Sequence, residues 1–311
     1  MEDGLENHSH NEGVGGEHGD ALVAHGDQDY VAPEEGEESE VADFHERILS
    51  CDDPRRMEIS PEEREWAEDI KAVIEGIEEI DNLSDFMYAQ LAIIHGEDIS
   101  TAVEIANRLQ EARQEYDIEE TFEDGVVKLQ KLIRLCPKAN MYFGYNNERG
   151  CYTQVFDYGK LDMDLMKQEK NAHATIAASY YQYHCFAPDF EAVRKGTIWI
   201  AECQGYQWMP KRGGLRYSER FWNDLGSAYP QTIQEYNCFH TPAMFNVMKS
   251  MLRPFIAQDI YSKINLGCSF PGGRLDSVYM IPTPQIAEQR VLSKWHEALE
   301  LRFANEQSFA L

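Results

Sequence analysis

The sequence predicts an α/β fold in which an N-terminal helical subdomain precedes a mostly parallel sheet flanked by helices. Three observations predict it. Apolar residues at helical spacing fill 60–135, short β-branched and aromatic runs follow, and helical segments separate most of those runs. Strands that alternate with helices need crossover connections, which join parallel strands. With 311 residues, of which 43% are hydrophobic, the chain is long enough for a sizeable core.

Residues 1–57 are predicted to form a disordered acidic tail. Residues 1–50 contain 15 Asp and Glu and one Arg, and the tail is poor in aromatic residues. Such a segment cannot bury enough apolar surface to offset the entropy that it would lose on ordering. We therefore divide the chain into this tail, a helical subdomain over 58–118 and a larger domain over 119–311.

Helix start signals mark the helical subdomain. Ser60-Pro61-Glu62-Glu63 is a capping box with Pro at the first helical position. Apolar residues at helical spacing predict further helices after Ser84, near Ser100 and over 119–135. Pro137 ends the last of these helices.

Strand signals begin after Pro137. A hairpin is predicted from two runs around a polar turn, and three further runs predict buried strands; the five runs are 141–145, 151–156, 196–201, 233–239 and 263–267. Helical spacing predicts the intervening helices over 161–187 and 217–228 and a C-terminal helix over 284–304. A further helix is predicted to begin at Thr241-Pro242, capped by Thr241, and to stop before Pro254.

Charge and composition limit the classes of protein. The net charge of −27 argues against generic nucleic-acid binding, because most of the surface would repel phosphate. The sequence has no run of 18 apolar residues and no basic or apolar leader after Met1. Seven scattered cysteines without a C-x-x-C pair are expected to be reduced thiols. We therefore expect a cytoplasmic protein.

Catalytic motifs are missing from the sequence. It contains no G-x-S-x-G elbow, P-loop, G-x-G-x-x-G or H-E-x-x-H. His184 and Cys185 are neighbours in the chain and so cannot pair as base and nucleophile, and Glu202 is a lone carboxylate at a strand end. These observations predict a protein that is not an enzyme and needs no metal or cofactor.

The segment 241–263 carries the strongest positive signal. It is rich in methionine and apolar over a wider surface than one core stripe needs, although an ordinary buried helix would also fit. The wider segment 191–263 holds nine basic and six acidic residues, a net +3 in an acidic chain. A basic surface beside an apolar helix would suit an anionic membrane, and a solvated face of chance sign is the alternative.

The order of motifs in this region resembles the CRAL-TRIO lipid-binding family, which includes retinaldehyde-binding, tocopherol-transfer and phosphatidylinositol-transfer proteins. The residues that carry the resemblance, in order, are Tyr229-Pro230, Asn237-x-x-x-x-Pro242-x-x-Phe245, Leu252-Arg253-Pro254-Phe255-Ile256 and Ser262-Lys263-Ile264-x-Leu266-Gly267. The strand from Gly196 and the helical segment 84–115 are also similar to the family pattern. Together these motifs extend over about residues 60–283.

The resemblance implies a lipid cavity above the sheet, closed by a helical gate over about 242–257. It implies transfer of one hydrophobic lipid between membranes without catalysis, with a transient membrane surface and no nucleic acid as partners. The implied pocket and gate residues are Tyr180, Tyr183, Ile198, Ile200, Phe245, Met248, Met251, Leu252, Phe255, Ile256 and Ile260. The residues expected at a headgroup or membrane are Lys249, Arg253, Lys263, Lys211 and Arg212.

Departures from the family pattern bear on the ligand. Gln231 stands where phosphatidylinositol-binding members carry a Glu, and the Arg that these members place in the helical region has no match here, although their Lys corresponds to Lys263. The departures favour a sterol, tocopherol, retinoid or carotenoid over a phospholipid. The alternative hypothesis is a ligand-free interaction or adaptor module with the same fold, which uses the acidic tail to bind a partner.

Overall fold

The structure is a computed structural model, and it describes residues 54–77, 83–146, 149–166, 168–205, 220–226, 228–243, 245–256, 258–269 and 284–311. All of these residues belong to one compact unit. The predicted tail up to residue 53 lies outside the described residues, as do Lys211 and Arg212.

Four helices build the N-terminal part of the fold: α2 (Pro61–Glu75), α3 (Asp85–His95), α4 (Ile99–Glu115) and α5 (Phe122–Leu135). The predicted capping box is confirmed, because Glu63 N–H donates to Ser60 Oγ and Ser60 N–H donates to the Glu63 carboxylate. Ser84 caps α3, and α4 begins near Ser100 as predicted, with Asp98 as its cap. The predicted helical beginning of the fold is therefore present.

A five-stranded sheet follows, with its strands in chain order. The strands are β1 (Asn140–Asn146), β2 (Cys151–Asp157), β3 (Thr197–Glu202), β4 (Ile233–Phe239) and β5 (Ile264–Cys268). β1 and β2 form the predicted antiparallel hairpin, and the other neighbouring pairs are parallel. The predicted α/β class and mostly parallel sheet are thus confirmed.

Crossover segments connect the parallel strands. The connection from β2 to β3 contains α6 (Met163–Met166), α7 (Glu169–Phe186) and α8 (Phe190–Lys195), and that from β4 to β5 contains α10 (Phe245–Leu252) and α11 (Gln258–Ser262). Strands added one after another in one direction through right-handed crossovers place the connecting helices on one face of the sheet. Trp199 of β3 lies on that face, because its ring centroid is 4.8 Å from that of Phe186 on α7.

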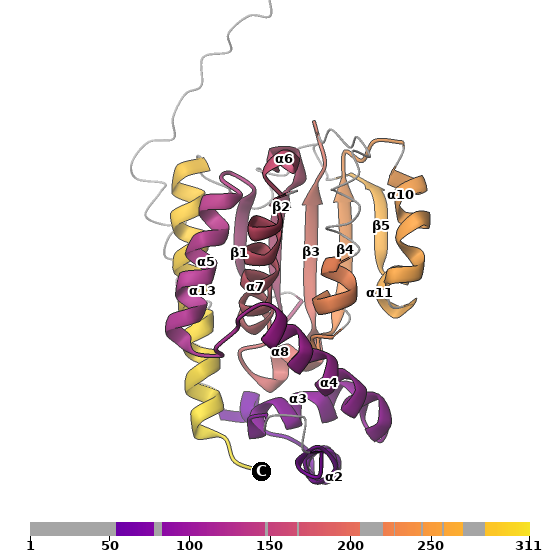
Figure 1. Cartoon of the computed structure of the whole chain (residues 1–311), viewed down its shortest axis with the longest axis vertical. Coiled ribbons are helices and arrows are strands. Elements are labelled where there is room, and N and C mark those ends of the chain that lie inside the picture. Colours follow the sequence, from indigo (N-terminus) through magenta and orange to yellow (C-terminus); the bar gives the residue numbers. More distant parts are fainter. Residues whose placement is uncertain are drawn as a thin grey trace, which may run out of the picture. The chain divides into compact units, whose positions relative to one another are not determined.

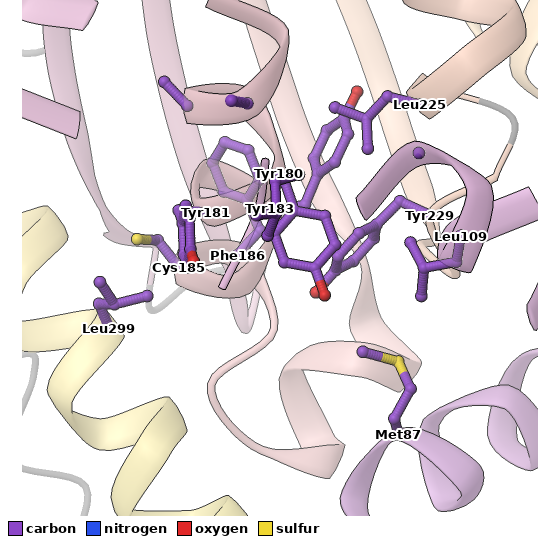
Figure 2. Close-up of a cluster of buried hydrophobic side chains, with 14 of the residues drawn as sticks. Met87, Leu109, Tyr180, Tyr181, Tyr183, Cys185, Phe186, Leu225, Tyr229 and Leu299 are labelled. Atoms are coloured by element: carbon purple, nitrogen blue, oxygen red, sulfur yellow. The ribbon is translucent and has the colours of Figure 1, made fainter. Parts of the chain in front are cut away.

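The main core lies where the helices meet this face (Figure 2). Tyr180, Tyr181, Tyr183 and Phe186 of α7 gather there with Tyr229, Leu109 of α4 and Leu299. Leu299 belongs to α13 (Pro284–Ser308), which packs against β1, α5 and α7. Figure 1 shows α13 beside β1 and α10 beside β5, at opposite ends of the sheet. Because one hydrophobic cluster joins α2–α5 to the sheet helices, segments 58–118 and 119–311 share a core.

Three local features differ from the predictions. Pro54–Met57, assigned to the tail by composition, form a short 3₁₀ helix, since Arg56 is buried in a two-point ion pair with Asp189. Helix α8 was not predicted. The predicted Thr241 cap is wrong: α10 begins at Phe245, and Thr241 Oγ1 instead accepts the N–H of Gly267.

Candidate functional site

Helix α10 presents chemically different side chains on its two faces. Phe245 is buried against Ala201, Cys203 and Cys238 of the sheet. Residues two positions along a helix point to roughly opposite sides, and Val247 is 59% exposed. Met251, one turn later on the same side as Val247, is 45% exposed. The outward side of α10 is therefore apolar.

The inward side of α10 carries its cation. Lys249 Nζ donates to the carbonyl oxygen of Ile264 over 2.6 Å, and it lies 4.8 Å from the ring centroid of Tyr261 on α11. The guanidinium of Arg253, in the short 3₁₀ segment Arg253–Phe255, lies 5.8 Å from the same centroid. Two predicted membrane-contact residues thus converge on Tyr261. Lys263, the third described one, lies half-buried between α11 and β5.

A second small cluster attaches α11 and the preceding turn to the sheet. Ile256 and Ile260 are buried with Ile233, and the cluster packs against Trp199 and Tyr236. Tyr183 of α7 also contacts Trp199, with its ring centroid 6.3 Å from that of Trp199. The Trp199 Nε1–H is buried and has no acceptor among the described residues. The position between α7 and α11 is therefore aromatic, with one donor that no described residue accepts.

The predicted pocket residues are not all brought together. Tyr183, Ile256 and Ile260 lie around Trp199, whereas Tyr180 lies deeper in the main core. Ile198 and Ile200 project from the opposite face of the sheet, where they are buried with Cys151, Val155 and Phe239. Alternation along β3 places Ile198 and Ile200 opposite Trp199. The side chains of Met248, Leu252 and Phe255 lie outside the described part of the structure.

Two of the hollows lined by described residues differ in size and chemistry. One, of about 10 Å³, holds about one water molecule, and it lies beside Gln90, Tyr183 and Gln231. Both polar atoms of the Gln231 side chain are buried there without a partner among the described residues. The other, of about 300 Å³, is lined mainly by charged groups, including Glu111 and Glu115. Neither hollow suits a hydrophobic ligand in the described conformation.

A polar network lies inside the main core. Tyr180 donates a hydrogen bond to the Glu120 carboxylate, which also pairs with Arg113, and His184 Nδ1 lies 3.0 Å from the Tyr229 hydroxyl oxygen. Burial raises the pKa of Glu120, against the opposing effect of Arg113. Burial also holds the pKa of His184 well below its usual value. The neutral imidazole is the form that this interior accommodates.

The carboxyl end of the sheet holds a pair that sequence reasoning missed. Glu202 at the end of β3 accepts hydrogen bonds from Gln204 N–H and from His240 Nδ1, the latter at 2.9 Å. His240 follows β4, has a positive φ of 47° and is half-exposed. Neighbouring parallel strands end at one edge, so the placement of both residues at strand ends was the available signal. Glu202 is therefore not a lone carboxylate.

The described cysteines are free thiols. Five of the six described cysteines are buried and free, and burial raises the pKa of the Cys185 thiol well above its usual value. No cluster of His, Cys, Asp and Glu suited to a metal occurs among the described residues. Within the same residues, no helix is both long and apolar enough to cross a bilayer.

Comparison with known proteins identifies no family by sequence. No protein-family model matches the chain, and no curated protein matches it. Among solved structures, a crystal structure of Sfh5 is similar to this chain at 12% sequence identity with a TM-score of 0.43. The match covers 76% of this chain and 98% of the Sfh5 chain.

Proposed function

We propose that this protein binds one hydrophobic, lipid-sized molecule between α7 and the α10–α11 segment and moves it between membranes without a chemical step. The observation that carries the proposal is the two-sided geometry of α10. Phe245 and Lys249 attach the helix to the sheet, while Val247 and Met251 face outward. An exposed apolar pair on a separately attached helix suits a gate that opens at a lipid surface.

Among the described side chains, the α10–α11 segment is attached to the sheet through smaller buried clusters than the main core. Phe245 contributes to a cluster of four buried residues, and Ile256 and Ile260 contribute to a cluster of three. The main core instead joins α2–α5, α7 and α13 in one large cluster. Elements with few buried apolar contacts open at a lower free energy than the whole domain. The α10–α11 segment can therefore move while the core stays folded, which makes room for a ligand.

The side chains below this segment indicate the chemistry of the ligand. Trp199, Tyr236 and Ile233 offer aromatic and aliphatic contact, and the Trp199 Nε1–H offers a single hydrogen bond. Apolar pockets with few polar groups bind hydrophobic ligands and use those groups for orientation. The arrangement supports a neutral lipid with one hydroxyl or carbonyl group, such as a sterol, tocopherol or retinoid, over a phospholipid.

A transfer assay between donor and acceptor vesicles tests this proposal. Replacement of Val247 by Asn should slow transfer of a fluorescent sterol several-fold, because the outward apolar surface is lost. The matched control is Val127→Asn, since Val127 on α5 is 60% exposed and lies on another element. Equal transfer rates for the two variants, or no transfer by the unmodified chain, would contradict the proposal.

A second candidate function is an interaction module that binds no ligand. It is favoured by the packing of Tyr183, Ile256 and Ile260 around Trp199 and by the water-sized volume of the hollow beside Tyr183. In this case the acidic tail would bind a partner. Deleting residues 1–53, which spares the buried Arg56, should then abolish partner binding without unfolding the domain. Unchanged partner binding after this deletion would reject the candidate.

A further inference from the structure

We propose that Tyr261 withholds Lys249 and Arg253 from the membrane, so that α10 docks through Val247 and Met251 on an electrically neutral lipid surface. This inference rests on the proposed function, because it names the kind of membrane that the gate contacts. It concerns the selectivity of docking, and a ligand could still be bound if the inference is wrong.

One cation in α10 and one directly after it lie beside the same aromatic ring. Lys249 and Arg253 are one turn apart, and both side chains lie over the ring of Tyr261, at 4.8 and 5.8 Å from its centroid. A cation within about 6 Å of an aromatic face is attracted by the ring. Lys249 is held more firmly than Arg253, since its ammonium also donates to the Ile264 carbonyl. The contact with Tyr261 thus orders the two charges toward α11 and β5.

The outward side of α10 is the surface that can meet a bilayer. This side exposes Val247 and Met251, and their exposed neighbours within α10, Asn246 and Ser250, are uncharged. Arg253, which follows α10, is also exposed, but its guanidinium lies over the Tyr261 ring. The complete chain carries a net charge of −27, which repels an anionic bilayer. An apolar pair with uncharged neighbours on an acidic protein fits a zwitterionic bilayer better than an anionic one. Its docking free energy comes from apolar burial rather than from charge attraction.

Tyr261 sets this preference for a zwitterionic over an anionic bilayer. Tyr261→Leu removes the ring and would free both cations to turn toward a headgroup layer. Each basic residue near an anionic surface strengthens binding severalfold. Tyr261→Phe keeps the aromatic face and is the matched control. Comparison of Tyr261→Leu with Tyr261→Phe therefore separates the effect of the aromatic ring from that of the hydroxyl group.

Flotation of the full-length chain with vesicles tests the inference. One vesicle set is pure phosphatidylcholine, and in the other part of the lipid is phosphatidylserine. The unmodified chain and Tyr261→Phe should bind the neutral vesicles at least as tightly as the anionic ones. Tyr261→Leu should shift the ratio of affinities toward the anionic vesicles by roughly tenfold.

A second variant guards against misfolding of Tyr261→Leu. Arg253→Gln, with Tyr261 intact, should leave binding to anionic vesicles nearly unchanged, because the guanidinium is already directed toward the ring. The inference is overturned if the unmodified chain prefers anionic vesicles or binds neither set, if Tyr261→Leu folds without shifting the ratio, or if Arg253→Gln alone greatly weakens anionic binding. A failure of the proposed function would appear separately, as purified protein that carries no lipid.

Discussion

The Lys249 ammonium donates a hydrogen bond to the carbonyl oxygen of Ile264 over 2.6 Å, and this contact ties α10 to β5. Lys249→Gln shortens the side chain and removes its charge, so this hydrogen bond is lost. The free energy of local opening of α10 should decrease by about 1 kcal/mol. Amide hydrogen exchange over 245–252 should then become roughly fivefold faster, whereas exchange in α7 should stay the same.

Lys128 provides a matched control for that substitution. Its ammonium also donates to a backbone carbonyl, that of Asp117, over 2.9 Å, but it belongs to α5. Lys128→Gln should leave exchange in α10 unchanged. Equal effects of the two substitutions on α10 would show that Lys249 is no specific tether.

The entry of the chain into the domain depends on a buried ion pair. Arg56 donates to both oxygens of Asp189 at 2.9 and 3.0 Å, and both side chains are almost fully buried. Arg56→Met should lower the free energy of unfolding by about 3 kcal/mol, because the Asp189 carboxylate is left buried without its partner. Denaturant unfolding followed by circular dichroism measures the change.

The comparable exposed pair serves as the control. Arg194 pairs with Glu63 in the same two-point manner, but it is about one-third exposed. Arg194→Met should cost no more than about 1 kcal/mol, since water screens the pair. If both Arg substitutions cost the same, burial does not determine the strength of the Arg56 contact.

Gly196 directly precedes β3, and it lies close to the backbone of Thr232, which directly precedes β4. Its φ is 76°, and a Cβ atom there would lie 2.6 Å from the carbonyl oxygen of Thr232. Gly196→Ala should therefore destabilise the fold by about 3 kcal/mol, through backbone strain and steric overlap together. Gly205 has a similar φ of 74°, but no described residue lies within 4 Å of a Cβ atom there, so Gly205→Ala should cost only about 1 kcal/mol. Thermal unfolding that ranks the two variants equally would contradict the close approach.

Buried His184 makes stability depend on pH in one direction. Its pKa in the folded protein is held well below the usual value, first by burial and then by Arg302. In the unfolded chain His184 takes up a proton near pH 6.5, whereas in the folded protein it stays neutral to a lower pH. The free energy of unfolding is therefore highest above about pH 6.5 and decreases as the pH falls below that value.

The variant His184→Gln isolates this effect, since an amide does not titrate. Unfolding free energies measured between pH 7.5 and pH 5 should fall less steeply for the variant than for the unmodified chain. The comparison with the variant matters because Glu120, whose pKa is raised chiefly by burial, contributes with the opposite sign as the pH falls. Parallel pH profiles for the two proteins would contradict the neutral state of His184.

The sequence predicted the secondary structure of the sheet closely, and the reason is local. The run 233–239 contains Ile, Tyr, Cys and Phe among polar residues, and β4 has the same bounds. Arg56 shows where composition fails. Composition assigns the segment around it to the tail, whereas contacts with residues distant in the chain, chiefly Asp189, order it in the fold.

The pocket was harder to predict than the strands. Alternation along β3 separates Ile198 and Ile200 from Trp199, but it does not say which of the two faces the α10 segment covers. Strand order together with the right-handed crossover rule decides that, and it favours Trp199. The pairing of Glu202 with His240 likewise depends on β3 and β4 being neighbours. Neither relationship is visible from spacing within one segment.

Native mass spectrometry of the freshly purified, full-length protein shows whether it carries a lipid-sized ligand. We predict a population whose mass exceeds that of the chain by one hydrophobic molecule, with release of that molecule on mild activation. The bound fraction should fall in Trp199→Phe, which keeps an aromatic ring but lacks the unused Nε1–H donor. A single clean mass for the bare chain, before and after incubation with lipid vesicles, would contradict the account.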